Sequence, residues 1–261
     1  MKTFVFNKVY VATRACVAGP LESKGPLISL FDKVYEDLYC EESTFEKAET
    51  KMLSDLYLIL NEKNRKDLMN CTIAIGGDLS NQLCASHYFA RKLNSSFVGM
   101  YAACATSSLI IGQGALFVES GINQVLCFTS SHIGAAERQF RYPNEYGVQK
   151  KQSTTYTVTG AAGCILSNNK SNIKISAYTI GKIVDWNHTE VNDLGKAMAP
   201  AAFETIVDHL KNRKLNYEDY DAIVTGDLST NGFSFLKDML SQVGIKTEKR
   251  FNDCGLLMYE A

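Results

Sequence analysis

TIAIGGDLSN, residues 72–81, returns later in the chain as AIVTGDLSTN, residues 222–231. Each copy is a run of apolar, largely β-branched residues that ends in glycine, aspartate and leucine. Such a run is typical of a buried strand, and the Gly-Asp pair after it is typical of a turn. With Asp78 matched to Asp227, the copies lie about 150 residues apart, which is the period of a duplicated half-domain rather than of a solenoid. The repeat therefore predicts two related halves.

Amphipathic helices are predicted before both copies. Residues 45–60 carry apolar side chains at helical spacing, and Ser43 and Glu46 have the spacing of a capping box. The second such helix is predicted from Pro200, which suits position N1, to Leu210. The first half then continues with a predicted helix over 82–93, a strand over 97–101, a helix from 104 to 120, which Gly121 ends, and a strand over 124–130. Alternating strands and helices predict an α/β layered fold with largely parallel pairing.

The two predicted halves differ in length. The first is expected to span residues 1–170, with an inserted loop at 133–155, and the second residues 171–261. Pseudo-symmetry with the first half would require roughly 75 further residues of sheet and helix after the second copy. We therefore expect an α/β/α layered, duplicated fold whose second half is incomplete.

Composition excludes several classes of protein. The 27 Lys and Arg residues against 28 Asp and Glu residues give a formal net charge of −1, so we expect no nucleic-acid partner. The eight cysteines lack C-x-x-C spacing, a pattern that favours reduced thiols over a disulfide framework or a zinc site. We expect no cofactor. No signal peptide and no transmembrane helix are predicted, because the longest apolar stretch, residues 109–118, is short and interrupted by glycines.

Cys104 lies in GMYAACATSSLIIGQGALF, residues 99–117, where a predicted strand gives way to a predicted helix. Unsatisfied N–H groups and the positive dipole end at a helix start favour a thiolate. Small neighbours leave room for a ligand. Three interpretations remain open for Cys104: a nucleophile, a wall of a binding pocket, or a small buried thiol.

The duplicated halves, with a cysteine at the start of the helix after the third strand, resemble the thiolase superfamily. Short motifs spread from about residue 9 to the end of the chain narrow this resemblance to the stage V sporulation protein AD family. They are AGP (18–20), GPL (25–27), LFDK (30–33), TSSH (129–132), AERQFRYP (136–143), EYG (145–147), AMAPAA (197–202), TGDLS (225–229) and DCGLL (253–257).

The resemblance implies a protein that binds dipicolinate (pyridine-2,6-dicarboxylate), free or as its calcium chelate, for uptake into the developing spore. It implies no enzymatic turnover. Other stage V sporulation A-type membrane proteins are the implied partners, and the implied location is peripheral, on the cytoplasmic face of the spore inner membrane. A homodimer is expected by analogy with thiolase-like folds.

The predicted ligand site combines residues around Cys104 with residues that follow the strand at 124–130. Strand carboxyl ends are where α/β folds bind ligands, so His132 is a candidate, although structural histidines also occupy such ends. Guanidinium groups can hold carboxylates in a bidentate manner, and an aromatic ring can stack on a pyridine. Alternatively, the arginines pair with Glu137 and Glu145. The predicted set is Cys104, Thr106, Ser131, His132, Arg138, Arg141 and Tyr142.

Two further assignments concern other motifs. Asp78 and Asp227 can supply carboxylates to calcium, but helix capping is the favoured interpretation for both. GAAG, residues 160–163, lacks the lysine and hydroxyl of a phosphate loop and is predicted to be a tight strand crossing. The alternative function is a thiolase-like or ketoacyl-synthase-like acyltransferase in which Cys104 is acylated, and a third is a scaffold for protein interactions.

Overall fold

The computed structural model describes residues 1–64, 71–140, 155, 157–190, 193–247 and 250–259, with residues 137–140 described by their backbone alone. The chain forms two compact units. The larger consists of Val5–Tyr146 and Thr157–Ala177, and the smaller of Met1–Phe4, Gly147–Tyr156 and Tyr178–Ala261. The change from one unit to the other at Ala177 compares with a predicted boundary at residue 170.

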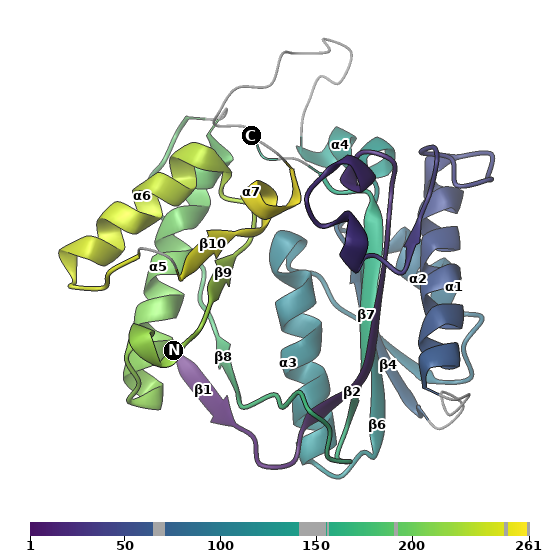
Figure 1. Ribbon diagram of the computed structural model, residues 1–261, viewed down its shortest axis with the longest axis horizontal. Coiled ribbons are helices and arrows are strands. Elements are labelled where there is room, and N and C mark those ends of the chain that lie inside the picture. Colours follow the sequence, from purple (N-terminus) through teal and green to yellow (C-terminus); the bar gives the residue numbers. More distant parts are fainter. Residues whose placement is uncertain (65–70, 141–154, 156, 191–192, 248–249, 260–261) are drawn as a thin grey trace. The chain divides into compact units, whose positions relative to one another are not determined.

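The larger unit is built on one six-stranded sheet in the order β3-β2-β7-β6-β4-β5 (Figure 1). Its helices lie on both faces of that sheet. In chain order its elements are β2 (Tyr10–Ala18), η1 (Glu22–Lys24), η2 (Ile28–Leu30), β3 (Lys33–Val34), α1 (Phe45–Lys63), β4 (Ile73–Asp78), α2 (Cys84–Ala90), β5 (Ser96–Gly99), η4 (Ala103–Ala105), α3 (Thr106–Glu119), β6 (Gln124–Ser131), α4 (Ile133–Phe140) and β7 (Gly160–Ser167).

The sheet is mixed, and β7 is the reason. Strands β4, β5 and β6 pair in parallel, as predicted, but β7 runs antiparallel to both of its neighbours, β6 and β2. Glycines let β7 fit closely between them: a Cβ on Gly160 would lie 2.7 Å from the carbonyl oxygen of Val17, and one on Gly163 would lie 2.8 Å from that of Cys127. The crossing predicted at residues 160–163 is thus the start of β7 between β2 and β6.

Helices α1 and α2 cover one face of this sheet and α3 covers part of the other (Figure 1). The apolar face of α1 is fully buried through Met52, Leu53, Leu56 and Leu60. Burial of each such side chain contributes roughly 1.5–3 kcal/mol, so this helix supplies much of the core. It begins at Phe45, as predicted, but the Thr44 hydroxyl, not that of Ser43, accepts the Lys47 N–H at 3.3 Å and caps it.

Helix α3 ends at the predicted position. Gly121 adopts a φ of +112°, and its N–H and that of Ile122 donate to carbonyls in the last turn of α3. A positive φ favours glycine at the residue after a helix. On the sheet side, Gly114 brings α3 close to β6, since a Cβ there would lie 2.6 Å from the Cys127 sulfur.

The smaller unit repeats part of this plan. Strands β4 and β5 of the larger unit are parallel and flank α2, and in the same way β9 and β10 are parallel and flank α6. A helix precedes each first strand, which confirms the duplication inferred from the repeated motif. The elements are β1 (Lys2–Val5), β8 (Ala177–Ile180), α5 (Leu194–Arg213), η6 (Tyr217–Asp219), β9 (Ile223–Thr225), α6 (Ser229–Gln242), β10 (Phe251–Asp253) and α7 (Cys254–Met258).

Pro200 does not begin a helix, and that prediction is wrong. Helix α5 starts at Leu194, where the Asp193 side chain accepts the Lys196 N–H at 3.1 Å and caps the helix, so Pro200 lies inside it. Helix α5 packs closely on α6. Gly195 and Gly232 lie in contact at this helix pair, and a Cβ on either would overlap its neighbour's backbone.

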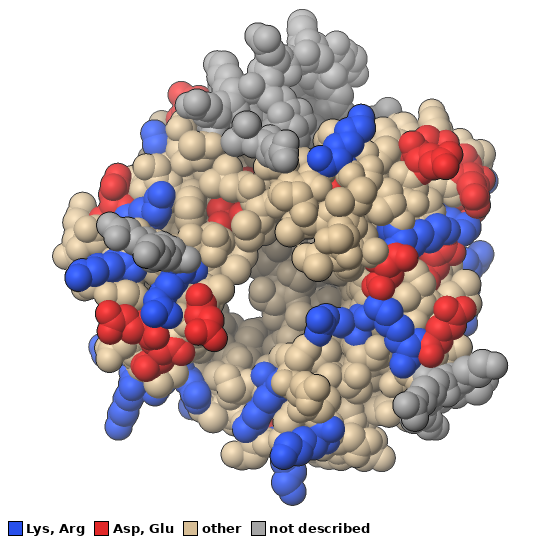
Figure 2. Space-filling view, viewed as in Figure 1, with Lys and Arg blue, Asp and Glu red and all other residues tan. Residues whose placement is uncertain are grey.

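Charged side chains of both signs are interspersed on the face of the molecule shown in Figure 2, as the near-zero net charge leads one to expect. Among the described residues, no helix is both long enough and apolar enough to cross a lipid bilayer.

The repeated motif provides a matched pair of glycine substitutions. A Cβ on Gly77 would overlap the carbonyl oxygen of Met100, whereas one on the equivalent Gly226 meets no described atom within 4 Å. Overpacking against fixed backbone costs about 1–3 kcal/mol. Gly77→Ala should therefore lower the free energy of unfolding by about 2–3 kcal/mol, and Gly226→Ala should change it by less than about 0.5 kcal/mol. Urea unfolding followed by circular dichroism measures both free energies. Equal destabilisation by the two substitutions would contradict the difference in packing between Gly77 and Gly226.

Candidate functional site

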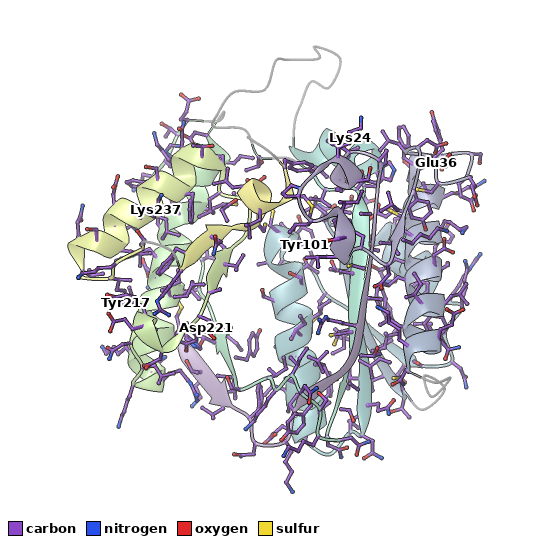
Figure 3. All side chains as sticks on the ribbon, in the orientation of Figure 1. Lys24, Glu36, Tyr101, Tyr217, Asp221 and Lys237 are labelled. Carbon is purple, nitrogen blue, oxygen red and sulfur yellow. The ribbon has the colours of Figure 1, made fainter. Side chains whose placement is uncertain are left out.

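A sharp turn joins β5 to α3, and Cys104 lies within it. The Met100 N–H donates to the Gly76 carbonyl at 2.9 Å, which extends the pairing of β5 with β4 by one bond. Ala103 then adopts a φ of +47°, and the Ala102 N–H donates to the Thr106 hydroxyl at 3.0 Å. We call residues 100–106 the elbow. Tyr101 projects from it near the N-terminal end of α3 (Figure 3).

Cys104 is exposed in the single 3-10 turn that leads into α3. Only alanines flank it directly in the chain. Backbone N–H groups in the first turn of a helix lack partners within that helix and attract anions. The elbow therefore combines an exposed thiol with the positive end of a 14-residue helix.

The elbow shares one edge of the sheet with two other segments. In the parallel ladders, Gly76 of β4 pairs with Gly99 of β5, and Asp78 pairs with Ser130 of β6. The carboxyl ends of these strands therefore meet at the same edge, with Cys104 just beyond β5 and His132 just beyond β6. Such edges are where open α/β sheets bind ligands.

His132 is fully buried, and both of its ring nitrogens have hydrogen-bond partners. Nε2 lies 2.7 Å from the Leu38 carbonyl oxygen, to which it donates, and Nδ1 accepts the Gly134 N–H at 3.0 Å. The ring also stacks on Phe45 at a centroid distance of 5.0 Å. Burial lowers the pKa of His132 and favours the neutral ring that this arrangement requires. These contacts match the structural interpretation of His132, and a ligand contact there would require one of them to break.

The hydroxyls of Thr106 and Ser131 are also engaged. Thr106 is 2% exposed and its oxygen closes the elbow, while the Ser131 hydroxyl donates to the Val158 carbonyl. Arg138 belongs to α4, but its side chain lies outside the described part of the chain, as do Arg141 and Tyr142 entirely. Of the seven predicted site residues, four are thus placed along one sheet edge.

A buried carboxylate pair at this edge was not predicted. Glu49 of α1 is 3% exposed and accepts a hydrogen bond from the Ser130 hydroxyl at 2.8 Å. Burial, together with the nearby charge of Asp78, raises the pKa of Glu49 to about 8. The sequence does carry a signal for this residue, because Glu49 falls on the buried face of α1, beside Ala48 and one turn before Met52 and Leu53.

Asp78 and Asp227 accept N–H groups at helix starts, as the sequence favoured, although Leu83 and Leu228 occupy the N-cap positions of α2 and α6. The Asp78 carboxylate accepts the N–H groups of Ala85 and Ser86, each at 2.9 Å, in the first turn of α2. Asp227 accepts the Ser229 N–H at 2.9 Å at the start of α6. Nowhere in the described ranges do three His, Cys, Asp or Glu side chains gather as a metal site.

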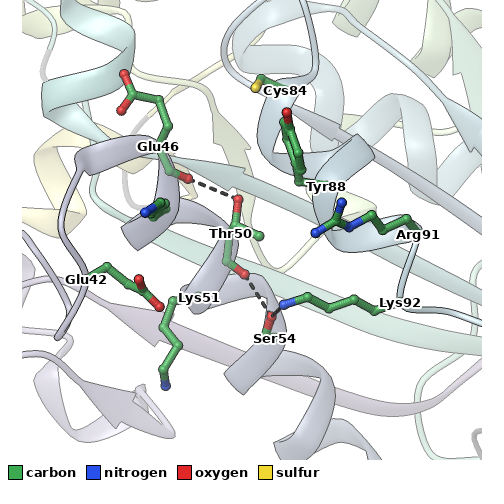
Figure 4. Close-up of a pocket in the computed structure, with 10 residues that line it drawn as sticks. Glu42, Glu46, Thr50, Lys51, Ser54, Cys84, Tyr88, Arg91 and Lys92 are labelled. Carbon is green, nitrogen blue, oxygen red and sulfur yellow. Dashed lines mark hydrogen bonds between the residues drawn. The ribbon is translucent and has the colours of Figure 1, made fainter.

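The described part of the larger unit contains cavities on both faces of its sheet. One, of about 500 Å³, lies between α1 and α2 (Figure 4). Another, of about 460 Å³, lies beside α3 over the sheet face formed by β2, β7 and β6, and its lining includes Arg14, Ile110 and Cys164. None of the seven predicted site residues lines either of these two cavities.

The sequence profile of the stage V sporulation protein AD family matches residues 1–261. The chain is also 40% identical, over 260 residues, to stage V sporulation protein AD of Bacillus subtilis strain 168. That alignment covers 99% of this chain and 77% of the relative. The chain belongs to the stage V sporulation protein AD family. It is therefore a sporulation protein.

Solved structures show the fold to be thiolase-like. The 3-oxoacyl-(acyl carrier protein) synthase III of Xanthomonas oryzae pv. oryzae superimposes with a TM-score of 0.61 at 12% identity, over 95% of this chain and 85% of that one. Cerulenin-bound OleA of Xanthomonas campestris superimposes with a TM-score of 0.63 at 13% identity, over 95% of this chain and 82% of that one. The α/β fold of this family member thus resembles that of the ketoacyl synthases, as the resemblance to the thiolase superfamily led us to expect.

The buried Glu49 makes stability depend on pH. Its pKa in the folded protein, about 8, exceeds its ordinary value near 4.5. Between these two values only the folded state holds the proton, so the free energy of unfolding falls as pH rises through this window. Glu49→Gln keeps an oxygen for Ser130 and needs no proton. We expect this variant to be more stable than wild type at pH 8, by on the order of 1–3 kcal/mol, and nearly equal at pH 5.

Urea unfolding at pH 5, 6.5 and 8 measures this difference. Glu62→Gln, an exposed change near the C-terminal end of α1 and far from Glu49 in the helix, serves as the control and should follow wild type at every pH. A Glu49→Gln variant that loses stability equally at all three pH values would show that the carboxylate is charged in the folded protein.

Proposed function

We propose that this protein binds dipicolinate, free or as its calcium chelate, at the sheet edge beside the elbow, and supports uptake of that compound into the developing spore. Membership of the stage V sporulation protein AD family over residues 1–261 is the observation that carries the proposal. In this role the protein works beside stage V sporulation A-type membrane proteins, peripherally, on the cytoplasmic face of the spore inner membrane.

The chemistry of the elbow suits such a ligand. Dipicolinate is a flat aromatic ring with two carboxylates, so its site needs localised donors and an open wall. The N–H groups that open α3 supply donors, and the alanines around Cys104 leave the wall uncrowded. Helix α4 starts directly after β6 and contains Arg138, and Arg141 and Tyr142 follow this helix in the sequence. In the proposal the arginines hold carboxylates and Tyr142 stacks on the ring.

Binding without turnover is favoured over acyl transfer by the state of His132. A cysteine nucleophile needs a base to take its proton, and His132, which follows β6 at this sheet edge, is buried with both ring nitrogens bonded. Acyl transfer remains the second candidate because the solved structures with this fold include a 3-oxoacyl-(acyl carrier protein) synthase and because Cys104 is exposed. In that case the Cys104 thiolate would attack a thioester and release the leaving thiol.

Calorimetric titration with dipicolinate, with and without calcium, tests the proposal. We expect saturable heat for wild type, at least about tenfold weaker binding for Cys104→Phe, whose ring would fill the elbow wall, and little response to benzoate, which has one carboxylate. Cys84→Ala, at another exposed thiol, is the matched control and should bind as wild type does. Equal binding by folded wild type and Cys104→Phe would place the ligand elsewhere, and no binding by the folded wild-type chain would contradict the proposal.

A further inference from the structure

The groove between α1 and α2 has the dimensions of a small-molecule site. Its volume of about 500 Å³ lies within the range of 300–1,000 Å³ that is typical of ligand pockets. The two helices run side by side in the same direction, since Glu46 and Cys84 line one end while the Lys92 amine donates to the Ser54 hydroxyl at 3.1 Å at the other. From Glu46 to Ser54 the groove follows α1 for about 12 Å.

Two cations occupy one end of this groove. Arg91 and Lys92 follow the last turn of α2, and both are exposed. The Arg91 guanidinium lies over the Tyr88 ring at 5.3 Å from its centroid, and Lys92 donates to Ser54. Within the described residues neither of these two side chains forms an ion pair. Their charges are therefore available to an anion.

The groove is lined by further charges, of which Lys47 donates to the Ser43 hydroxyl at 3.0 Å. The Lys51 amine pairs with Asp55 at 2.6 Å, and Asp55 is also paired with Lys33. Glu42 and Glu46 lie at the end away from Arg91 and Lys92, as Figure 4 shows. An extended polyanion or an anionic lipid surface would meet these carboxylates, whereas a compact anion can sit at the cationic end alone.

We propose that the groove binds a small organic anion with two or more negative charges, carried on carboxylate or phosphate groups, at Arg91 and Lys92. The guanidinium can hold one oxyanion by two parallel hydrogen bonds, and the lysine adds a point charge. Tyr88, 55% exposed, offers a face for the body of the ligand, and the Thr50 and Ser54 hydroxyls line the groove beneath it. This site is separate from the elbow and does not depend on dipicolinate binding there.

Calorimetry at low ionic strength, with inorganic phosphate and citrate as probes and acetate as the singly charged control, tests this site. Wild type should bind phosphate or citrate saturably and more tightly than acetate, and the tighter of the two probes identifies the anionic group. Arg91→Gln/Lys92→Gln should weaken binding at least about tenfold, which corresponds to the loss of one charge-assisted contact. Glu42→Gln/Glu46→Gln should tighten it about twofold, because repulsion from the far end is removed.

Two controls separate this site from general charge and from the elbow. Lys170→Gln/Lys237→Gln removes the same charge elsewhere, including a lysine that lies over the Phe233 ring at 5.0 Å, and should leave binding unchanged. Cys104→Phe should also leave citrate binding unchanged. Equal weakening by Arg91→Gln/Lys92→Gln and Lys170→Gln/Lys237→Gln would show that only net charge matters and would contradict the proposal. The proposal would also be overturned if neither phosphate nor citrate bound saturably to folded wild type.

Discussion

The contact between the elbow and β4 is the constraint on which the larger unit depends. Met100 continues the β5 ladder onto Gly76, and its carbonyl occupies the space that a side chain on Gly77 would need. This close approach turns the chain at the end of β5, so that Thr106 can bond to Ala102 and start α3. The same helix then covers β6 and β4 from the face opposite α1 and α2. One glycine therefore fixes both the position of Cys104 and the layering of the unit.

Buried carboxylates hold the other elements of this sheet edge. Asp78 ends β4 and accepts two N–H groups of α2, so a strand end and a helix start are joined by one side chain. Glu49 approaches from α1 and bonds to Ser130 at the end of β6. His132 ties the start of α4 to Leu38, ahead of α1. Asp78, Glu49 and His132 are thus matched to partners, which keeps a potential ligand site rigid without filling the space beyond the elbow.

The sequence predicted the duplicated plan because hydrophobic spacing and the repeated Gly-Asp motif are local signals. Helix ends were predicted less well, since caps depend on single hydrogen bonds: Thr44 replaces Ser43, and Asp193 starts α5 six residues before Pro200 is reached. The sheet direction of β7 could not be read from its composition, because pairing is set by long-range contacts.

Within the site, the sequence located Cys104 and the strand end before His132, but it could not determine what the His132 nitrogens contact. The partners of that ring, Leu38 and Gly134, include a residue far away in the chain. Glu49 was missed because an acidic residue within an amphipathic helix is ordinarily solvated. Its position on the apolar face of α1 is the signal that separates it from exposed neighbours such as Glu46.

Cysteine footprinting tests whether dipicolinate binds beside the elbow, as we propose. Labelling with N-ethylmaleimide followed by mass spectrometry reports each thiol separately. Cys84, Cys104 and Cys254 are exposed, whereas Cys40, Cys71, Cys127 and Cys164 are buried and serve as internal references. We expect dipicolinate to slow labelling of Cys104 several-fold and to leave Cys84, at the end of the α1–α2 groove away from Arg91 and Lys92, unchanged. Unchanged labelling of Cys104 at saturating dipicolinate, or protection of Cys84 in its place, would contradict it.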